Sequence, residues 1–392
     1  MSADLSAFNA NWNYPTPTRF GVGRIKELPD ACGELGITKP LLVTDAGLAK
    51  LPIVEQTVAV NQAAGLETTV FSDVKANPVG ENVDAGVAAY RAAGCDGVIS
   101  FGGGSGLDVG KAVALMVGQE RPLWDFEDVG DNYARVNEAG VAPHLAVPTT
   151  SGTGSEVGRS SVITDAAEHK KKIIFHPLML PARVICDPAL TAALPPALTA
   201  GTGMDALSHN LEAYCTGFFH PMGDGIAVEG MRLVRSSLVR AFRDGSDLAA
   251  RCEMMAASAM GATAFQKGLG AMHAIGHAVG ARFDTHHGTT MACLMPYVLL
   301  FNRAAIEDKV ARLAAYLEIG APSFEAVVEW VLDLRETLGI PHTLADMGVG
   351  EEAVDMLAAQ AVNDPTAPSN PVPLTEDKLK VLIGEALRGE LG

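Results

Sequence analysis

The sequence predicts two domains, an α/β domain with a parallel sheet over residues 1–190 and an all-helical domain over residues 191–392. The chain has 392 residues, more than one hydrophobic core usually fills. Its first half alternates short β-rich runs with longer Ala-rich segments of helical spacing, the pattern of a parallel α/β sheet. After prolines at Pro188, Pro195 and Pro196, only long helical periodicities remain.

Five segments have the composition of buried strands. They are PLLVT (40–44), TTVF (68–71), GVISF (97–101), LAVPT (145–149) and RVICD (183–187). Ala-rich segments such as 54–65 and 80–94 have the spacing of helices between them. We expect the cleft between the two domains to hold the functional site.

The composition is that of a compact globular protein, with 48% hydrophobic and 19% charged residues. The formal charge of −17 disfavours nucleic acid and anionic lipid as partners. The N-terminus lacks the basic and apolar regions of a signal peptide, and apolar stretches such as MACLMPYVLLF are too short to span a membrane. Six cysteines without a CxxC pair are typical of reduced thiols in a cytoplasmic protein.

A glycine cluster stands between a predicted strand and a predicted helix. Gly102, Gly103 and Gly104 lack a Cβ, so their backbone can approach a pyrophosphate closely. Ser105 then opens a helix whose first amides favour an anion. The cluster matches neither GxGxxG nor a P-loop, and a plain tight turn is the alternative for the cluster by itself.

Two further strand ends carry polar groups. Asp45 follows the strand at 40–44, where its carboxylate can accept both ribose hydroxyls of an adenosine and would repel a 2′-phosphate. The loop 148–158 contains Thr149, Thr150 and Thr153 among glycines, which suits a phosphate or ribose, although an ordinary polar loop looks the same. The three features together predict a dinucleotide, and Asp45 favours NAD over NADP.

Two predicted helices carry potential metal ligands. Asp205 and His209 are four residues apart, as are His273 and His277, so each pair shares one helix face. Hydrogen bonds within the core are the alternative for each pair. Together the pairs predict a single metal ion with nitrogen and oxygen ligands, closed by one of the two histidines of DTHHG (284–288). Spacing leaves open whether His277 is a ligand or an acid–base group.

Four motifs in this order resemble the iron-containing (group III) alcohol dehydrogenases. They are GGGSGLDVGK (102–111), PTTSGTGSE (148–156), GMDALSHNLEAY (203–214) and HAIGHAVGARFDTHHG (273–288). The resemblance runs over nearly the whole chain, from RFGVGRIKELP to NPVPLT. It implies a two-domain architecture like that of dehydroquinate synthase, with an N-terminal dinucleotide-binding domain and a C-terminal metal-binding domain.

The resemblance also implies a site. The family's one Asp and three His ligands match Asp205, His209, His273 and His287. The implied ion is Fe²⁺, with Zn²⁺ as the alternative. His277 matches a histidine beside the nicotinamide and is the catalytic candidate, whereas His286 matches no functional position. The matching cofactor contacts are Asp45, Asn77, Gly103, Gly104, Ser105, Asp108, Thr149, Thr150, Thr153 and Lys171.

The implied activity is NAD(H)-linked hydride transfer between a small primary or secondary alcohol and its carbonyl product. The metal ion polarises the alcohol oxygen, and His277 relays the released proton. Two departures from the family pattern, Lys267 and Arg159, predict an anionic group on the substrate; the alternative is that both pair with acids or with cofactor phosphates.

Three other functions compete with a simple dehydrogenase. One is a transhydrogenase that passes hydride between a hydroxyacid and an oxoacid on retained NAD. Another is a dehydroquinate synthase-like lyase, which the ligand pattern and the few basic residues disfavour. A nucleotide-binding scaffold without catalysis is disfavoured because every ligand position is present. We expect a cytoplasmic homo-oligomer, a dimer or larger, that acts on a small alcohol or aldehyde.

Overall fold

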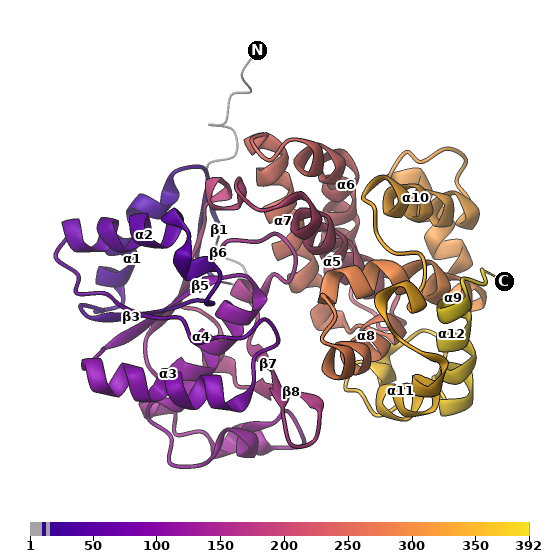
Figure 1. The fold of residues 1–392 in the computed structure, drawn as a ribbon. Coiled ribbons are helices and arrows are strands. Elements are labelled where there is room, and N and C mark those ends of the chain that lie inside the picture. Colours follow the sequence, from indigo (N-terminus) through magenta and orange to yellow (C-terminus); the bar gives the residue numbers. More distant parts are fainter. Residues whose placement is uncertain (1–9, 13–15, 392) are drawn as a thin grey trace. The chain divides into compact units, whose positions relative to one another are not determined.

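The computed structural model describes residues 10–12, as backbone, and residues 16–391. It divides the chain into two compact units (Figure 1). The first contains Met1–Thr150 and Gly154–Ala193, and the second contains Ser151–Thr153 and Leu194–Gly392. The sequence predicted one boundary, between residues 190 and 191, which would place Ser151–Thr153 in the first domain. The segment groups with the helices because Gly152 packs directly on Thr202, where a Cβ would approach the Thr202 backbone to 2.9 Å.

The first unit is built on a seven-stranded sheet of order β1-β2-β9-β6-β5-β3-β4, parallel except for β1. Its strands are β1 (Ala10–Trp12), β2 (Thr18–Phe20), β3 (Pro40–Val43), β4 (Thr69–Phe71), β5 (Gly97–Gly102), β6 (His144–Pro148) and β9 (Arg183–Cys186). The five predicted segments correspond to β3, β4, β5, β6 and β9. The sequence did not predict β1, β2 or the separate antiparallel pair β7 (Ser160–Asp165) and β8 (Lys170–Phe175).

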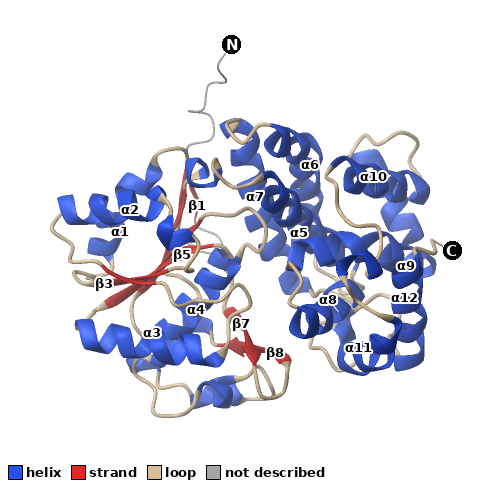
Figure 2. Cartoon of the chain, viewed as in Figure 1, coloured by secondary structure: helices blue, strands red, loops and turns tan. Residues whose placement is uncertain are grey.

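Helices cover both faces of this sheet (Figure 2). They are α1 (Leu28–Glu34), α2 (Pro52–Ala63), α3 (Gly80–Ala93) and α4 (Gly104–Met116). Consecutive strand residues such as Leu41 and Leu42 belong to different core clusters, one formed with α3 and α4 and the other with α1 and α2. A strand buried on both sides has no polar face, which is why these segments read as continuous apolar runs.

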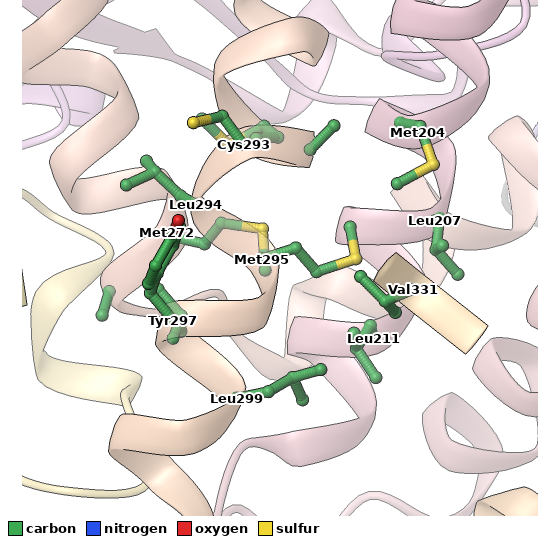
Figure 3. Packing of buried hydrophobic residues seen from close by; sticks show 14 of the residues in the cluster. Met204, Leu207, Leu211, Met272, Cys293, Leu294, Met295, Tyr297, Leu299 and Val331 are labelled. Atoms are coloured by element: carbon green, nitrogen blue, oxygen red, sulfur yellow. The ribbon is translucent and has the colours of Figure 1, made fainter. Parts of the chain in front are cut away.

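The second unit contains α5 (Pro196–Cys215), α6 (Pro221–Arg243), α7 (Leu248–Ala264), α8 (Ala271–Phe283), α9 (His287–Tyr316), α10 (Phe324–Thr337), α11 (Val354–Ala361) and α12 (Glu376–Arg388). One continuous core joins them, and Figure 3 shows Met204, Leu207 and Leu211 of α5 within it. Every residue of α5 from 203 to 215 is buried, so this helix is central. Any polar side chain on α5 between residues 203 and 215 therefore lies inside the protein.

Helix α9 is the one helix in the described part of the chain that is long and apolar enough to cross a membrane. Within its most apolar window 67% of the residues are buried inside the protein. Residues such as Leu294, Met295 and Leu299 pack in the helical core, which accounts for the composition of α9 (Figure 3).

Candidate metal centre and nucleotide loops

Four predicted ligands come together inside the helical unit. Asp205 and His209 lie on α5, His273 lies on α8, and His287 is the first residue of α9. Their ligand atoms all lie within 4.8 Å of one another. The Asp205 Oδ1 atom is 3.4 Å from His287 Nε2 and 4.0 Å from His209 Nε2. All but His287 are buried.

Two glycines allow neighbouring helices to pack closely on α5 around these ligands. A Cβ on Gly288, next to His287, would lie 2.1 Å from the carbonyl oxygen of Gly201 on α5. A Cβ on Gly261 of α7 would lie 2.9 Å from the Cβ of His209. Contacts below 3 Å are not sterically permitted, so glycine is needed where α9 and α7 pack on α5 around the cluster.

Hydrogen bonds orient two of the imidazoles. His273 Nδ1 donates to the Glu212 carboxylate at 2.6 Å, and His209 Nδ1 donates to the Gly152 carbonyl at 3.3 Å. Each ring is thereby left with Nε2 as the nitrogen that can bind a metal. Burial lowers the pKa of His209 to about 4, so its ring is neutral, the form that binds metal. Burial acts in the same direction on His273, but Glu212 raises the pKa of His273 overall.

The donor set fits a divalent ion. Among residues 16–391, the buried atoms Asp205 Oδ1 and His273 Nε2 have no hydrogen-bond partner. Buried polar atoms are normally paired, because an unpaired one costs about 1–3 kcal/mol. A cation between them would satisfy both atoms. Three imidazoles and one carboxylate suit Fe²⁺ or Zn²⁺.

His277 lies beside this cluster but outside it. Its Nδ1 donates to Asp364 Oδ2 at 2.9 Å, and its ring stacks on His287 with centroids 5.8 Å apart. Asp364 also accepts the Thr366 hydroxyl at 2.6 Å. Burial would raise the pKa of Asp364, but His277 and Thr366 lower it overall. The lowered pKa keeps the Asp364 carboxylate ionised next to the His277 ring. This arrangement suits an acid–base function for His277.

Sequence reasoning missed Glu212 and Asp364. Glu212 is seven residues after Asp205 and shares its helix face, so the 3.6-residue period could have identified it. Asp364 is 87 positions from His277 and carried no such signal. His286, for which no function was expected, is the N-cap of α9 and accepts the Thr289 amide at 3.3 Å.

The glycine cluster opens α4, as expected. Gly102 has φ 146°, a conformation that favours glycine, and Gly103 is the N-cap residue. The Ser105 hydroxyl donates to the Ala76 carbonyl, so it braces the loop after β4. A Cβ on Gly103 would lie 3.1 Å from Thr150 Cγ2. The structure therefore brings the glycine loop against the start of the second predicted loop.

Asp108 supports the second loop from α4. Its carboxylate accepts the Ser155 hydroxyl at 2.6 Å and the Val162 amide at 2.9 Å, and it pairs with Lys111 at 3.2 Å. Lys111 also donates to the Ser155 carbonyl at 3.1 Å. The contact of Asp108 with a cofactor stays a prediction, and the contacts observed here hold the segment 155–162 in place.

The remaining predicted cofactor residues are distributed over several segments. Asp45, two residues after the end of β3, accepts the amides of Gly47 and Leu48 through Oδ1, each at 2.9 Å. The ends of β3, β5 and β6 share one edge of the sheet, where parallel α/β sheets bind ligands. Asn77 follows β4, Thr149 follows β6, Lys171 lies on β8, and Thr153 belongs to the segment grouped with the helices.

Of the two unexpected cations, Lys267 is not available to a substrate, and the function of Arg159 stays a prediction. The Lys267 side chain has no exposed surface, and its Nζ lies 2.6 Å from Asp224 Oδ1. It also donates to the Tyr214 carbonyl at 3.2 Å. Arg159 is exposed in the α/β unit, with its guanidinium 5.6 Å from the Phe175 ring centroid. The Asp224 pairing favours a structural function for Lys267 over binding of a substrate anion.

An α/β unit with glycine and hydroxyl loops at its strand ends, together with a helical unit holding an Asp–His cluster, defines a metal-dependent oxidoreductase class. The model of the iron-containing alcohol dehydrogenase family matches residues 15–188, and that of the family's C-terminal part matches residues 199–387. The chain belongs to the iron-containing alcohol dehydrogenase family. The predicted family, fold class and metal-dependent alcohol dehydrogenase activity are confirmed.

Individual relatives cover almost the whole chain. It is 39% identical to 4-hydroxybutyrate dehydrogenase of Cupriavidus necator, over 91% of this chain and 94% of that protein. The crystal structure of 1,3-propanediol oxidoreductase matches with a TM-score of 0.90 and 34% identity, covering 97% of this chain and 99% of that one. Sulfoacetaldehyde reductase from Bifidobacterium kashiwanohense, solved in complex with NAD⁺, matches with a TM-score of 0.85, 29% identity and coverages of 96% and 98%.

Proposed function

We propose that this protein is an NAD(H)-linked dehydrogenase of small alcohols with a terminal hydroxyl, and that it reduces the corresponding aldehydes in the reverse direction. Residues 1–190 bind NAD, and residues 191–392 hold Fe²⁺ through Asp205, His209, His273 and His287. The observation that carries the proposal is the meeting of these four ligand atoms within 4.8 Å inside an apolar helical core. The three similar proteins described above are each named for a compound with a terminal hydroxyl or aldehyde group.

In the proposed reaction, the metal ion and NAD act on the substrate directly, and His277 and Asp364 handle the proton. A divalent ion held by the four ligands would supply Lewis acidity that lowers the pKa of the substrate hydroxyl, and NAD bound to residues 1–190 would supply the hydride acceptor. His277 accepts the hydroxyl proton at Nε2, because Nδ1 already donates to Asp364. Asp364 stabilises the resulting imidazolium. The products are the aldehyde, NADH and a proton that leaves through His277.

The choice of cofactor rests on Asp45. Its Oδ1 holds the turn at Gly47 and Leu48, so Oδ2 is the atom that accepts the ribose hydroxyls. A carboxylate at this position repels the 2′-phosphate of NADP. The remaining cofactor contacts of the proposal are those that the family resemblance implies, namely Asn77, Gly103, Gly104, Ser105, Asp108, Thr149, Thr150, Thr153 and Lys171.

The cellular context follows from charge and composition. We propose that the protein is cytoplasmic, since all six cysteines are free thiols, five of them buried. We propose that it binds neither nucleic acid nor membranes, because its net charge is −17. We also propose that it forms a homo-oligomer.

The test is an activity screen on protein loaded with Fe²⁺ or Zn²⁺. Terminal alcohols and aldehydes are assayed with NAD(H) and NADP(H), and metal content is measured for His273→Ala and His277→Ala. We expect NAD-linked turnover, loss of metal from His273→Ala and retention of metal by His277→Ala. Turnover of a hydroxyacid with an oxoacid without added NAD would instead identify the transhydrogenase. The opposite metal result for the two variants would reverse the ligand assignment.

A further inference from the structure

Glu212 has a carboxylate whose two oxygens bind different parts of α8. It lies on α5, one turn after His209, and only 5% of its surface is exposed. Its Oε2 accepts His273 Nδ1 at 2.6 Å, and its Oε1 accepts the Met272 amide at 2.8 Å. We propose that Glu212 is a positioning residue of the metal centre, which selects the metal-binding tautomer of His273. This inference rests on the metal site proposed above.

The tautomer follows from the hydrogen-bonding capacity of a carboxylate. An ionised carboxylate only accepts hydrogen bonds, so the proton of a neutral His273 ring is held on Nδ1. The lone pair is then on Nε2, which is buried and has no hydrogen-bond partner among residues 16–391. A ligating histidine whose other nitrogen donates to a carboxylate is held in orientation and made more basic. Glu212 thus prepares Nε2 for the ion.

Charge balance supports the same function. Asp205 and Glu212 are both buried, and in the described part of the chain neither forms a salt bridge to lysine or arginine. Two buried carboxylates without a cation are costly. The charge of a divalent ion would balance the charges of the two carboxylates, although of the two only Asp205 is a ligand.

The beginning of α8 provides a control for this proposal. Its N-cap residue, Gly270, has no side chain, and the next two amides are bound from elsewhere in the chain. Asn370 Oδ1 accepts the Ala271 amide at 3.0 Å, while Glu212 accepts that of Met272. Both residues therefore hold the helix start, but only Glu212 contacts the His273 ring. A change at Asn370 separates loss of a cap from loss of tautomer selection.

The experiment compares Glu212→Gln with Asn370→Ala. In Glu212→Gln the amide oxygen still accepts the Met272 amide, while the NH₂ group donates to His273 Nδ1 and moves the ring proton to Nε2. Affinity for Zn²⁺ and, anaerobically, for Fe²⁺ is measured by chelator competition, and thermal unfolding is measured on metal-free protein. We expect Glu212→Gln to bind each ion at least about tenfold more weakly, with an unfolding midpoint close to that of the unaltered protein. Asn370→Ala should unfold at a lower temperature but bind each ion within about threefold of the unaltered protein, since it leaves the tautomer unchanged.

The outcomes separate this inference from the proposed function. Equal metal affinity of Glu212→Gln and the unaltered protein would overturn the inference alone, whereas failure of the unaltered protein to bind either ion would overturn the metal site itself. Nitrogen-15 spectra of histidine-labelled, metal-free protein give a readout that needs no variant. We expect Nδ1 of His273 to carry a proton, and a ring protonated on Nε2 alone would overturn the inference even if Glu212→Gln does not fold.

Discussion

Replacing Lys267 with methionine distinguishes a substrate-binding cation from a structural one. The Lys267 side chain is completely buried, and its ammonium is bound by Asp224 and by the Tyr214 carbonyl. Methionine keeps most of the apolar volume of the lysine stem and removes the charge. We therefore expect Lys267→Met to lower stability and to leave selection between charged and neutral substrates unchanged.

The expected loss of stability follows from the surroundings of Asp224. Removing one partner of a fully buried ion pair costs about 3–5 kcal/mol, because the other charge is left unpaired. Here Asp224 keeps a second cation, Lys309 at 3.2 Å, and 30% of its side chain is exposed. Burial also lowers the pKa of Lys267 despite the opposing effect of Asp224, so removing the ammonium recovers desolvation energy. These effects reduce the expected cost to roughly 1–2 kcal/mol, or about 2–8 °C in the unfolding midpoint.

The assay combines thermal unfolding with kinetics. kcat/KM is compared for a hydroxyacid and for an uncharged alcohol of equal length. The control is Lys309→Met, because the Lys309 side chain is 27% exposed and its ion pair should contribute less than about 1 kcal/mol. A drop of about tenfold in the hydroxyacid preference of Lys267→Met, equivalent to about 1.4 kcal/mol, with an unchanged unfolding midpoint would refute the reasoning.

Three further predictions concern other groups. Asp45→Asn keeps an oxygen acceptor for the Gly47 amide but removes the charge, so the kcat/KM preference for NAD over NADP should fall by roughly tenfold; an unchanged preference would exclude Asp45 as its cause. His277→Ala should lower kcat by about 10²-fold at unchanged metal content, and loss of the metal would instead make His277 a ligand. Burial, assisted by the charge of Lys111, lowers the pKa of His144 to about 3, so the unfolded chain binds a proton below pH 6.5 that the folded chain does not. The stabilisation by neutral His144 is complete above pH 6.5 and is lost as the pH falls towards 3. Between these pH values, the free energy of unfolding measured with urea should fall with pH by up to about 1.4 kcal/mol per pH unit more than in His144→Asn. An equal pH dependence in the two proteins would contradict this.

The strands could be predicted from the sequence where all of their residues are buried. The strands at 40–43 and 97–102 are buried on both faces, so apolar runs between Ala-rich segments identified them. The pair β7 and β8 was missed because its residues alternate between buried and partly exposed positions, and three lysines begin β8. The three-residue strands β1 and β2 are too short to show a period.

The sequence by itself determined which residue types could form the site and which of them share a helix face. Asp205 and His209, like His273 and His277, are placed by the 3.6-residue period, which local hydrogen bonding imposes in any fold. Only the tertiary structure decided which partners the side chains have. The Glu212–His273 and His277–Asp364 contacts join residues 61 and 87 positions apart, and Lys267 meets Asp224 across 43 positions. Such contacts depend on how the helices pack, and the packing here depends on close backbone approaches at Gly261 and Gly288 that no local pattern encodes.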